Sequence, residues 1–190
     1  MNQDYDLVFL LEERSMKELL EVLLPRVIPK SVTFKCISHE GKQDLEKSIP
    51  RKLKAWKTAG RFIIMRDQDS GNCVKIKNHL KNLSNKSGRS DTLIRIVCHE
   101  LESWFLGDLA AVEKAFELKT GELSKKQNNK KYRNPDQLNS AKQELKKLVD
   151  SYQPISGSRK IGEYLEINNL DKNKSYSFKM FIKALKKIID

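Results

Sequence analysis

The first half of the chain alternates short apolar runs with polar segments. Two continuous apolar runs, Leu7–Leu11 and Phe62–Met65, have the length and composition of strands that are buried on both faces. Two further runs, Val32–Ile37 and Thr92–Val97, combine apolar and β-branched residues and also predict strands. We therefore expect four strands, each followed by a segment long enough to form a helix.

Helical periodicity separates these strands. The first helix is predicted after Ser15, whose spacing to Glu18 is that of a capping box. Its apolar side consists of Met16, Leu19, Leu20, Leu23 and Leu24. Further helices are predicted over Asp44–Trp56, with an interruption near Pro50, over Cys73–Leu83 before a loop at Asn82–Asp91, and from His99 to Leu106. Strand–helix alternation of this kind predicts an α/β fold, a mainly parallel, Rossmann-like sheet flanked by helices.

The second half of the chain is less regular. Ser124–Arg133 is basic and has few apolar residues, so it is predicted to be a loop that either contacts phosphates or is simply exposed. Pro135–Val149 and the segment from Phe178 to Ile189 have one apolar side each and predict amphipathic helices. We expect a core domain over 1–118 and a C-terminal helical extension over 119–190, packed on the core and including the basic loop 124–134.

Acidic residues follow the predicted strands, and those after the first, third and fourth strands are the candidates for a shared site. Ligands of parallel α/β sheets bind at the carboxyl ends of the strands, which meet at one edge. The acids at these positions are Glu12 and Glu13, then Asp67 and Asp69, then Glu100 and Glu102. A cluster of carboxylates repels itself unless a cation is bound, and Mg²⁺ prefers a few carboxylates together with water and phosphate oxygens. The pattern predicts a site for Mg²⁺ (or Mn²⁺).

Each of these acids also has a plainer interpretation. Asp67–Gly71 has the composition of a turn or helix cap, and Glu12 or Glu13 is compatible with an ordinary loop acid. Glu100 and Glu102 fall on opposite sides of a helix, so only one is expected to reach the cluster. Candidate cations that would steady a developing charge are Lys42 and either Arg159 or Lys160, and His39 is a candidate base.

The overall charge favours a polyanionic partner. The chain has 37 Lys and Arg against 25 Asp and Glu, a net charge of +12, which suits nucleic acid but also serves solubility. The three cysteines form no Cys-x-x-Cys pair, and no apolar segment is long enough to span a membrane. We expect a cytoplasmic protein without a signal peptide, a disulfide framework or a zinc site. No phosphate-binding loop of the G-x-x-x-x-G-K-[ST] type occurs, so the chain is not itself an ATPase of that kind.

Two segments resemble TOPRIM domains, which occur in topoisomerases, primases and the overcoming-lysogenization-defect (OLD) nucleases. Leu10-Leu11-Glu12 resembles the first TOPRIM motif, and Arg66-Asp67-Gln68-Asp69 resembles the D-x-D motif. The resemblance implies that Glu12 is a metal ligand or general acid/base, that Asp67 and Asp69 bind metal, and that Glu102 or Glu100 is the further acid. The pattern departs at Glu13, where TOPRIM domains usually have glycine, so Glu13 either crowds the backbone or adds a ligand.

The whole chain resembles more closely a bacterial domain-of-unknown-function family with a TOPRIM-like core. Members of that family tend to be encoded beside AAA or ABC-type ATPases in phage-defence contexts. The segments that carry this likeness are Gly41–Leu45, Arg66–Cys73, Arg95–Asp108, Tyr152–Lys160 and Ser177–Phe181.

The resemblance implies a Mg²⁺-dependent nuclease acting on DNA or RNA, with an ATPase as protein partner, and leaves a homo-oligomer open. The alternative is a non-catalytic TOPRIM-like adaptor that binds nucleic acid or the ATPase. A topoisomerase or primase does not fit, because 190 residues leave no room for their additional domains.

Overall fold

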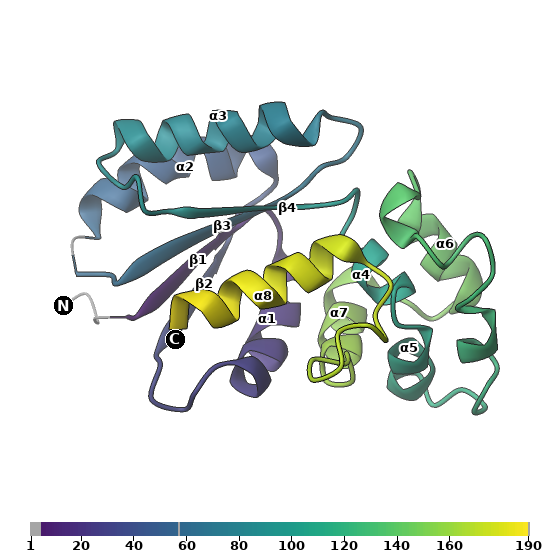
Figure 1. The fold of residues 1–190 in the computed structure, drawn as a ribbon. Helices are drawn as coiled ribbons and strands as arrows, with labels where there is room; N and C mark the ends of the chain where they lie inside the picture. The colour runs from purple at the N-terminus through teal and green to yellow at the C-terminus, as the bar shows by residue number, and fades with distance from the viewer. Residues whose placement is uncertain (1–4, 57, 190) are drawn as a thin grey trace.

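A four-stranded, all-parallel sheet forms the centre of the molecule (Figure 1). The computed structural model describes residues 5–56 and 58–189. The strands lie in the order β2-β1-β3-β4. Their bounds are β1 Leu7–Leu11, β2 Phe34–Ser38, β3 Arg61–Asp67 and β4 Leu93–Val97. The predicted α/β fold with a parallel, Rossmann-like sheet is confirmed.

Helices cover both faces of the sheet and also extend beyond one end of it (Figure 1). On one face lie α2 (Lys42–Ala55) and α3 (Cys73–Lys86), and on the other lie α1 (Arg14–Val27) and α8 (Tyr176–Ile189). Four shorter helices, with two 3₁₀ turns, lie together beyond one end of the sheet. These are α4 Glu102–Leu106, α5 Leu109–Ala115, α6 Ala141–Leu148 and α7 Pro154–Gly162, with the turns at Ser124–Lys126 and Pro135–Gln137.

Side chains alternate along each strand, so the sheet has an apolar layer on each face. On the face toward α2 and α3, Val8, Leu10, Phe62 and Ile64 are fully buried. On the opposite face, residues such as Phe9 join a larger core that continues without a break through α1 and α4–α8. The helices after residue 118 are therefore packed on the sheet domain; the division at 118/119 stays a prediction.

The first helix begins differently from the prediction. α1 starts at Arg14, its N-cap position is Glu13, and no side chain caps it, so the predicted capping box at Ser15 is wrong. The reason is that Ser15 lies inside the helix, where its hydroxyl donates to the carboxylate of Glu13. Glu18 instead forms ion pairs with Arg14 and Arg159.

The predicted helix over Pro135–Val149 is divided in two. A 3₁₀ turn at Pro135–Gln137 comes first, and α6 begins only at Ala141. Residues near the start of α8 hold this turn in place, because the Asp136 carboxylate accepts hydrogen bonds from the Ser175 hydroxyl and the Ser177 N–H.

Other element bounds shift by a few residues. β2 starts at Phe34 because the N–H of Val32 closes a turn onto Pro29, α3 continues through Asn82 to Lys86, and α4 begins at Glu102 instead of His99. α2 runs through Pro50 without a break. In the part of the chain that the structure describes, no helix has both the length and the apolar character needed to cross a membrane.

Candidate functional site

The carboxyl ends of β1 and β3 place two acids side by side. Leu11 is in register with Met65, so Glu12 lies beside Arg66 and Asp67. The Asp67 N–H donates to Glu12 Oε2 at 2.9 Å, and the Gly41 N–H after β2 donates to the Glu12 carbonyl at 2.9 Å. The position of Glu12 is therefore fixed by three neighbouring strand ends.

Asp67 lies at the centre of an acidic cluster, here defined as Glu12, Glu13, Asp67, Asp69 and Glu102. Its side chain is buried, and Oδ1 has no hydrogen-bond partner in the described structure. Burial is the largest cause that raises the pKa of Asp67 well above its usual value, and the other four carboxylates of the cluster raise it further. Burial likewise raises the pKa of Glu12, against the opposing hydrogen bond from Asp67. Carboxylates from three parts of the chain therefore repel each other at this sheet edge.

Glu102 and Glu100 have different environments. Glu102 begins α4, is 3% exposed, and accepts a hydrogen bond of 2.9 Å from the Tyr152 hydroxyl. Burial raises the pKa of Glu102 to about 7, although the hydrogen bond from Tyr152 opposes the shift. Glu100 accepts from the backbone N–H of Lys142 at 2.8 Å, at the start of α6. The structure thus brings Glu102 to the cluster and uses Glu100 to bind the end of another helix.

Asp69 lies on the exposed side of the cluster, beside Lys42. Its backbone is left-handed, with φ of 52°, and its carboxylate is 3.4 Å from Lys42 Nζ. The Asp69 N–H donates to the His99 carbonyl at 2.9 Å, and His99 Nδ1 lies 2.7 Å from the Asp69 carbonyl oxygen. The loops after β3 and β4 are joined by these bonds, and Lys42 is the predicted cation that the structure places at the cluster.

The other predicted cations lie elsewhere. Lys160 Nζ lies over the ring of Phe116 at 5.7 Å, and Arg159 pairs with Glu18 at 3.3 Å. Within the described residues, no contact joins either side chain to the acidic cluster.

His39 is held as a structural residue. Its Nδ1 is 2.8 Å from the Leu11 carbonyl oxygen and its Nε2 is 2.5 Å from the Ser48 hydroxyl. Burial lowers the pKa of His39, which favours the neutral ring, and both nitrogens are engaged. It ties β1 to α2 and has no free nitrogen with which to take a proton.

Two site residues were missed in the sequence. Arg66 is buried, with Nε 3.9 Å from Glu12 Oε2 and Nη1 2.5 Å from Glu46 Oε1, so it anchors Glu12 from the side. Tyr152 reaches Glu102 from the start of α7. Arg66 follows the apolar run Phe62–Met65 directly, and a charged residue at the end of a buried strand is the signal that could have found it.

A cation fits this cluster chemically. Carboxylate oxygens are the ligands that Mg²⁺ prefers, and Asp67 Oδ1 is a buried, unpaired acceptor among four other acids. In the ranges 5–56 and 58–189, however, no three His, Cys, Asp or Glu side chains are arranged to hold a metal ion. A metal held by this cluster would therefore require its side chains to change position from this structure.

A groove opens beside the cluster. It is lined from the strand ends by Glu13, His39 and Gly41, and from α7 by Pro154 and Ile155. Glu13 is thus shared between the acidic cluster and a surface that a solute can reach.

Comparison with known proteins assigns the chain to a protein family. A search of curated proteins and a search of solved structures each gave no significant match. A family model described as Domain of unknown function (DUF4276) matches residues 11–186, which include the strands β2, β3 and β4, the last residue of β1 and every member of the acidic cluster. The chain belongs to the DUF4276 family.

Proposed function

We propose that this chain is a Mg²⁺- or Mn²⁺-dependent nuclease that hydrolyses DNA or RNA phosphodiesters in the cytoplasm. The observation that carries the proposal is Asp67, a buried carboxylate with an unpaired oxygen, surrounded by four other acids at the carboxyl edge of a parallel sheet. Such repulsion is relieved by a divalent cation. The Glu–D-x-D order on β1 and β3 supports a TOPRIM-like arrangement.

The residues divide into ligands and supports. Glu12, Asp67, Asp69 and Glu102 would hold the metal, which supplies Lewis-acid polarisation of a phosphoryl oxygen and an activated water. Arg66 and the Asp67 N–H orient Glu12. Lys42, half exposed beside Asp69, is placed to neutralise charge that develops on the phosphate.

Charge supports a nucleic acid as the substrate. The chain carries a net charge of +12 despite its acidic cluster, so its remaining surface is basic and attracts a polyanion. We include an AAA/ABC-type ATPase as partner and a role in phage defence only because of the family resemblance, which is carried by Gly41–Leu45, Arg66–Cys73, Arg95–Asp108, Tyr152–Lys160 and Ser177–Phe181.

Calorimetry with Mg²⁺ and Mn²⁺, followed by cleavage of plasmid DNA and total tRNA, tests the proposal. We compare the parent with Asp67→Asn, and use Asp150→Asn as a control that removes an equal charge from an exposed position. The expected result is that Asp67→Asn loses metal binding and cleavage while Asp150→Asn keeps both. Full cleavage by Asp67→Asn would show that the site is wrong.

A non-catalytic adaptor is the second candidate. It is favoured by the absence of a ready three-ligand arrangement among the described His, Cys, Asp and Glu residues. In this case neither metal ion binds, the plasmid and tRNA stay intact, and Asp67→Asn still binds nucleic acid as well as the parent does. Metal binding without cleavage would instead indicate an enzyme that needs its ATPase.

A further inference from the structure

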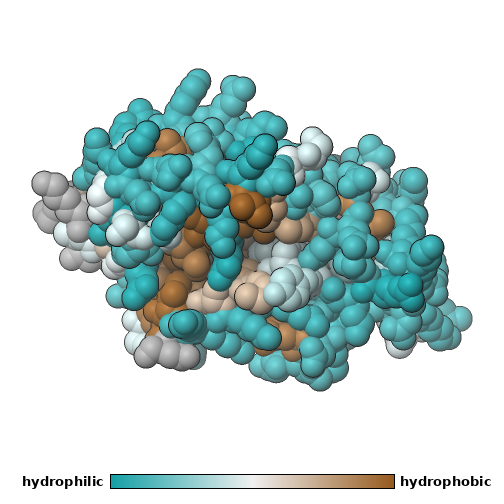
Figure 2. Space-filling model, turned by 45° about the horizontal axis from the view of Figure 1, so that its top comes forward, coloured by the Kyte–Doolittle hydropathy of each residue, from teal (hydrophilic) through white to brown (hydrophobic). Residues whose placement is uncertain are grey.

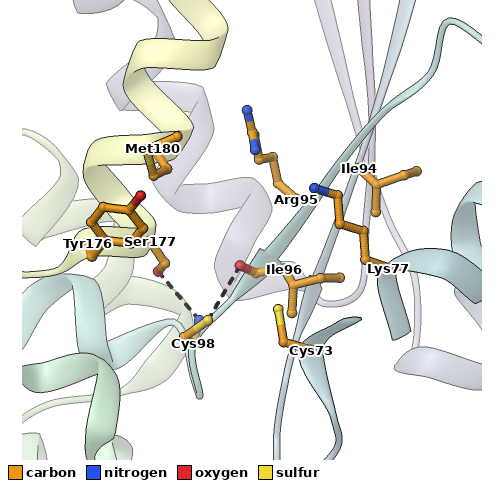
Figure 3. Close-up of a pocket in the computed structure, with 9 residues that line it drawn as sticks. All are labelled: Cys73, Lys77, Ile94, Arg95, Ile96, Cys98, Tyr176, Ser177 and Met180. Atoms are coloured by element: carbon orange, nitrogen blue, oxygen red, sulfur yellow. Dashed lines mark hydrogen bonds between the residues drawn. The ribbon is translucent and has the colours of Figure 1, made fainter. Parts of the chain in front are cut away.

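A groove along the outer edge of β4, on the side away from β3, contains no residue of the acidic cluster. It runs between α3 and α8 and is lined by Cys73 and Lys77 from α3, by residues of β4, and by Tyr176, Ser177 and Met180 from α8 (Figure 3). Figure 2 shows an apolar band on this face between hydrophilic surfaces. One of the exposed large apolar side chains of the described structure, Tyr176, lines this groove. The groove is therefore a place where apolar surface meets solvent.

The floor of this groove is the open edge of the sheet. β4 is the last strand in the order and pairs only with β3. The Val97 carbonyl accepts from the Gln68 N–H on the β3 side at 2.8 Å. Because backbone groups of a strand point alternately to its two sides, the N–H and C=O groups of Ile94 and Ile96 point outward into the groove. There the Ile96 carbonyl has only a thiol contact of 4.0 Å from Cys98.

The open edge of β4 is limited at both ends by side chains that bind its backbone. The Cys98 N–H, which is next in the outward series, donates to the Ser177 hydroxyl at 3.4 Å (Figure 3). At the other end, the Thr92 carbonyl accepts from Lys81 Nζ at 3.4 Å. The side chains of Ser177 and Lys81 thus bind the backbone groups at the two ends of this edge. The outward backbone groups of Ile94 and Ile96 lie between them, and one short strand is long enough to pair with these groups.

The groove carries positive charge and no acid. Lys77 projects into it from α3, and Arg95 from β4 lines it on the side of α8 (Figure 3). Arg95 Nε is buried without a hydrogen-bond partner, and neither cation forms an ion pair within the described residues. An acidic side chain at this position would pair with a guanidinium that is already partly desolvated.

A second copy of the chain suits this edge poorly. Antiparallel pairing of two β4 edges through Ile94 and Ile96 would put Arg95 opposite Arg95 of the other copy. Like charges that face each other across a strand pair are destabilising. The charge therefore favours a different, acidic occupant.

We propose that the β4 edge is a docking site for an extended segment of a partner protein, which adds a fifth strand and places acidic side chains on the α8 face, against Arg95. Backbone bonds to Ile94 and Ile96 provide affinity, and Arg95 provides selectivity. This inference does not rest on the proposed nuclease function, because no residue of the acidic cluster takes part.

A fluorescein-labelled peptide that alternates valine with glutamate tests the site on the full chain by fluorescence anisotropy. Arg95→Gln is expected to weaken binding about tenfold, while Lys186→Gln, which removes an equal charge from an exposed position on α8, leaves binding unchanged. The same peptide with glutamine for glutamate is expected to bind at least about tenfold more weakly. Equal losses for both protein variants would overturn the proposal, because attraction to net charge then explains the binding.

Amide hydrogen exchange provides the second readout. The peptide is expected to slow exchange at the Ile94 and Ile96 N–H groups, and a peptide whose backbone amides are N-methylated is expected to lose this protection. Protection of both amides without peptide, in a sample that scatters light as a dimer, would overturn the proposal in favour of a second copy. Peptide binding that leaves both amides unprotected would place the peptide elsewhere and would also overturn it.

Discussion

At the scale of single residues, Asp67 is the group whose surroundings are least favourable. A buried carboxylate without a partner on one oxygen costs free energy when it is ionised, and four neighbouring carboxylates add to this cost. A folded protein keeps such a group when it serves a purpose other than stability, which is the physical reason for regarding it as a ligand.

A pH prediction follows for Asp67. Its pKa is raised in the folded state, so its contribution to stability is fully present below the unfolded value of 3.8 and is lost as pH rises through the folded pKa. Metal-free protein is expected to lose thermal stability from about pH 4 toward neutral pH. At neutral pH, Mg²⁺ at about 100 times its Kd restores about 2.7 kcal/mol. Melting curves with and without Mg²⁺ measure both effects, and in Asp67→Asn both should shrink.

A second pH prediction concerns Glu102. Its pKa rises from 4.5 to about 7, mainly through burial, so stability from the neutral acid is complete below about pH 4.5 and lost as pH rises through about 7. Glu102→Gln keeps an acceptor for Tyr152 and is expected to be more stable than the parent by about 3 kcal/mol above that window. Denaturant unfolding at both ends of the window measures this. Glu100→Gln is the control, and an equal gain in that variant would contradict the assignment.

At the scale of elements, α1 and α7 are held together by close packing. A Cβ added at Gly162 would lie 2.7 Å from a methyl of Val22 and 2.8 Å from a methyl of Leu19. Arg26 of α1 also donates to the carbonyls of Gly162 and Leu165, at 2.7 and 2.8 Å. The absence of a side chain at Gly162 is what allows the two helices to approach.

Gly162→Ala should therefore destabilise the fold although alanine favours helix. Overpacking of this kind costs about 1–3 kcal/mol, which exceeds the gain in helix propensity. Chemical denaturation measures the change in unfolding free energy. Glu163→Ala, at the exposed neighbouring position, is expected to change it by less than about 0.5 kcal/mol. A neutral or stabilising Gly162→Ala would show that the helices have room to move apart.

The same packing explains what the sequence pattern predicted and what it did not. The strands were predictable because Leu7–Leu11 and Phe62–Met65 are buried on both faces and so are apolar throughout. The meeting of Glu12 with Asp67 followed from parallel pairing. In contrast, α7 contains two glycines and reads locally as a loop; it is a helix because Gly157 packs on Tyr152 and Gly162 packs on α1. Tyr152 was missed for the same reason.

At the scale of the whole molecule, charge is divided between one acidic cluster and a basic remainder. The segment from Ser124 carries exposed lysines at 125, 126 and 130, whereas Lys131 is paired with Glu144 at 2.6 Å. If this segment contacts a nucleic acid backbone, its unpaired lysines are the ones that release counterions on binding.

Substituting Lys125, Lys126 and Lys130 by Gln is expected to weaken binding to DNA or RNA. The slope of log K against log salt should become smaller in magnitude by about 2–3, close to one per lost phosphate contact. Filter binding across a salt series measures the slope. A variant with Gln at the exposed Lys183, Lys186 and Lys187 of α8 is the matched control. Equal effects in both variants would mean that net charge, and not this segment, determines binding.

The joining of α1 to α7 also has a consequence for how the protein is made. Arg26 is synthesised well before its partners Gly162 and Leu165, so α1 leaves the ribosome long before α7 exists to cover it. Glu102 is likewise synthesised before Tyr152, the residue that donates a hydrogen bond to it. A chain cut short by interrupted translation or by proteolysis before residue 152 would carry all five acids yet expose the apolar side of α1. Such fragments are recognisable to chaperones and proteases, so the cell would clear them before an incomplete site accumulates.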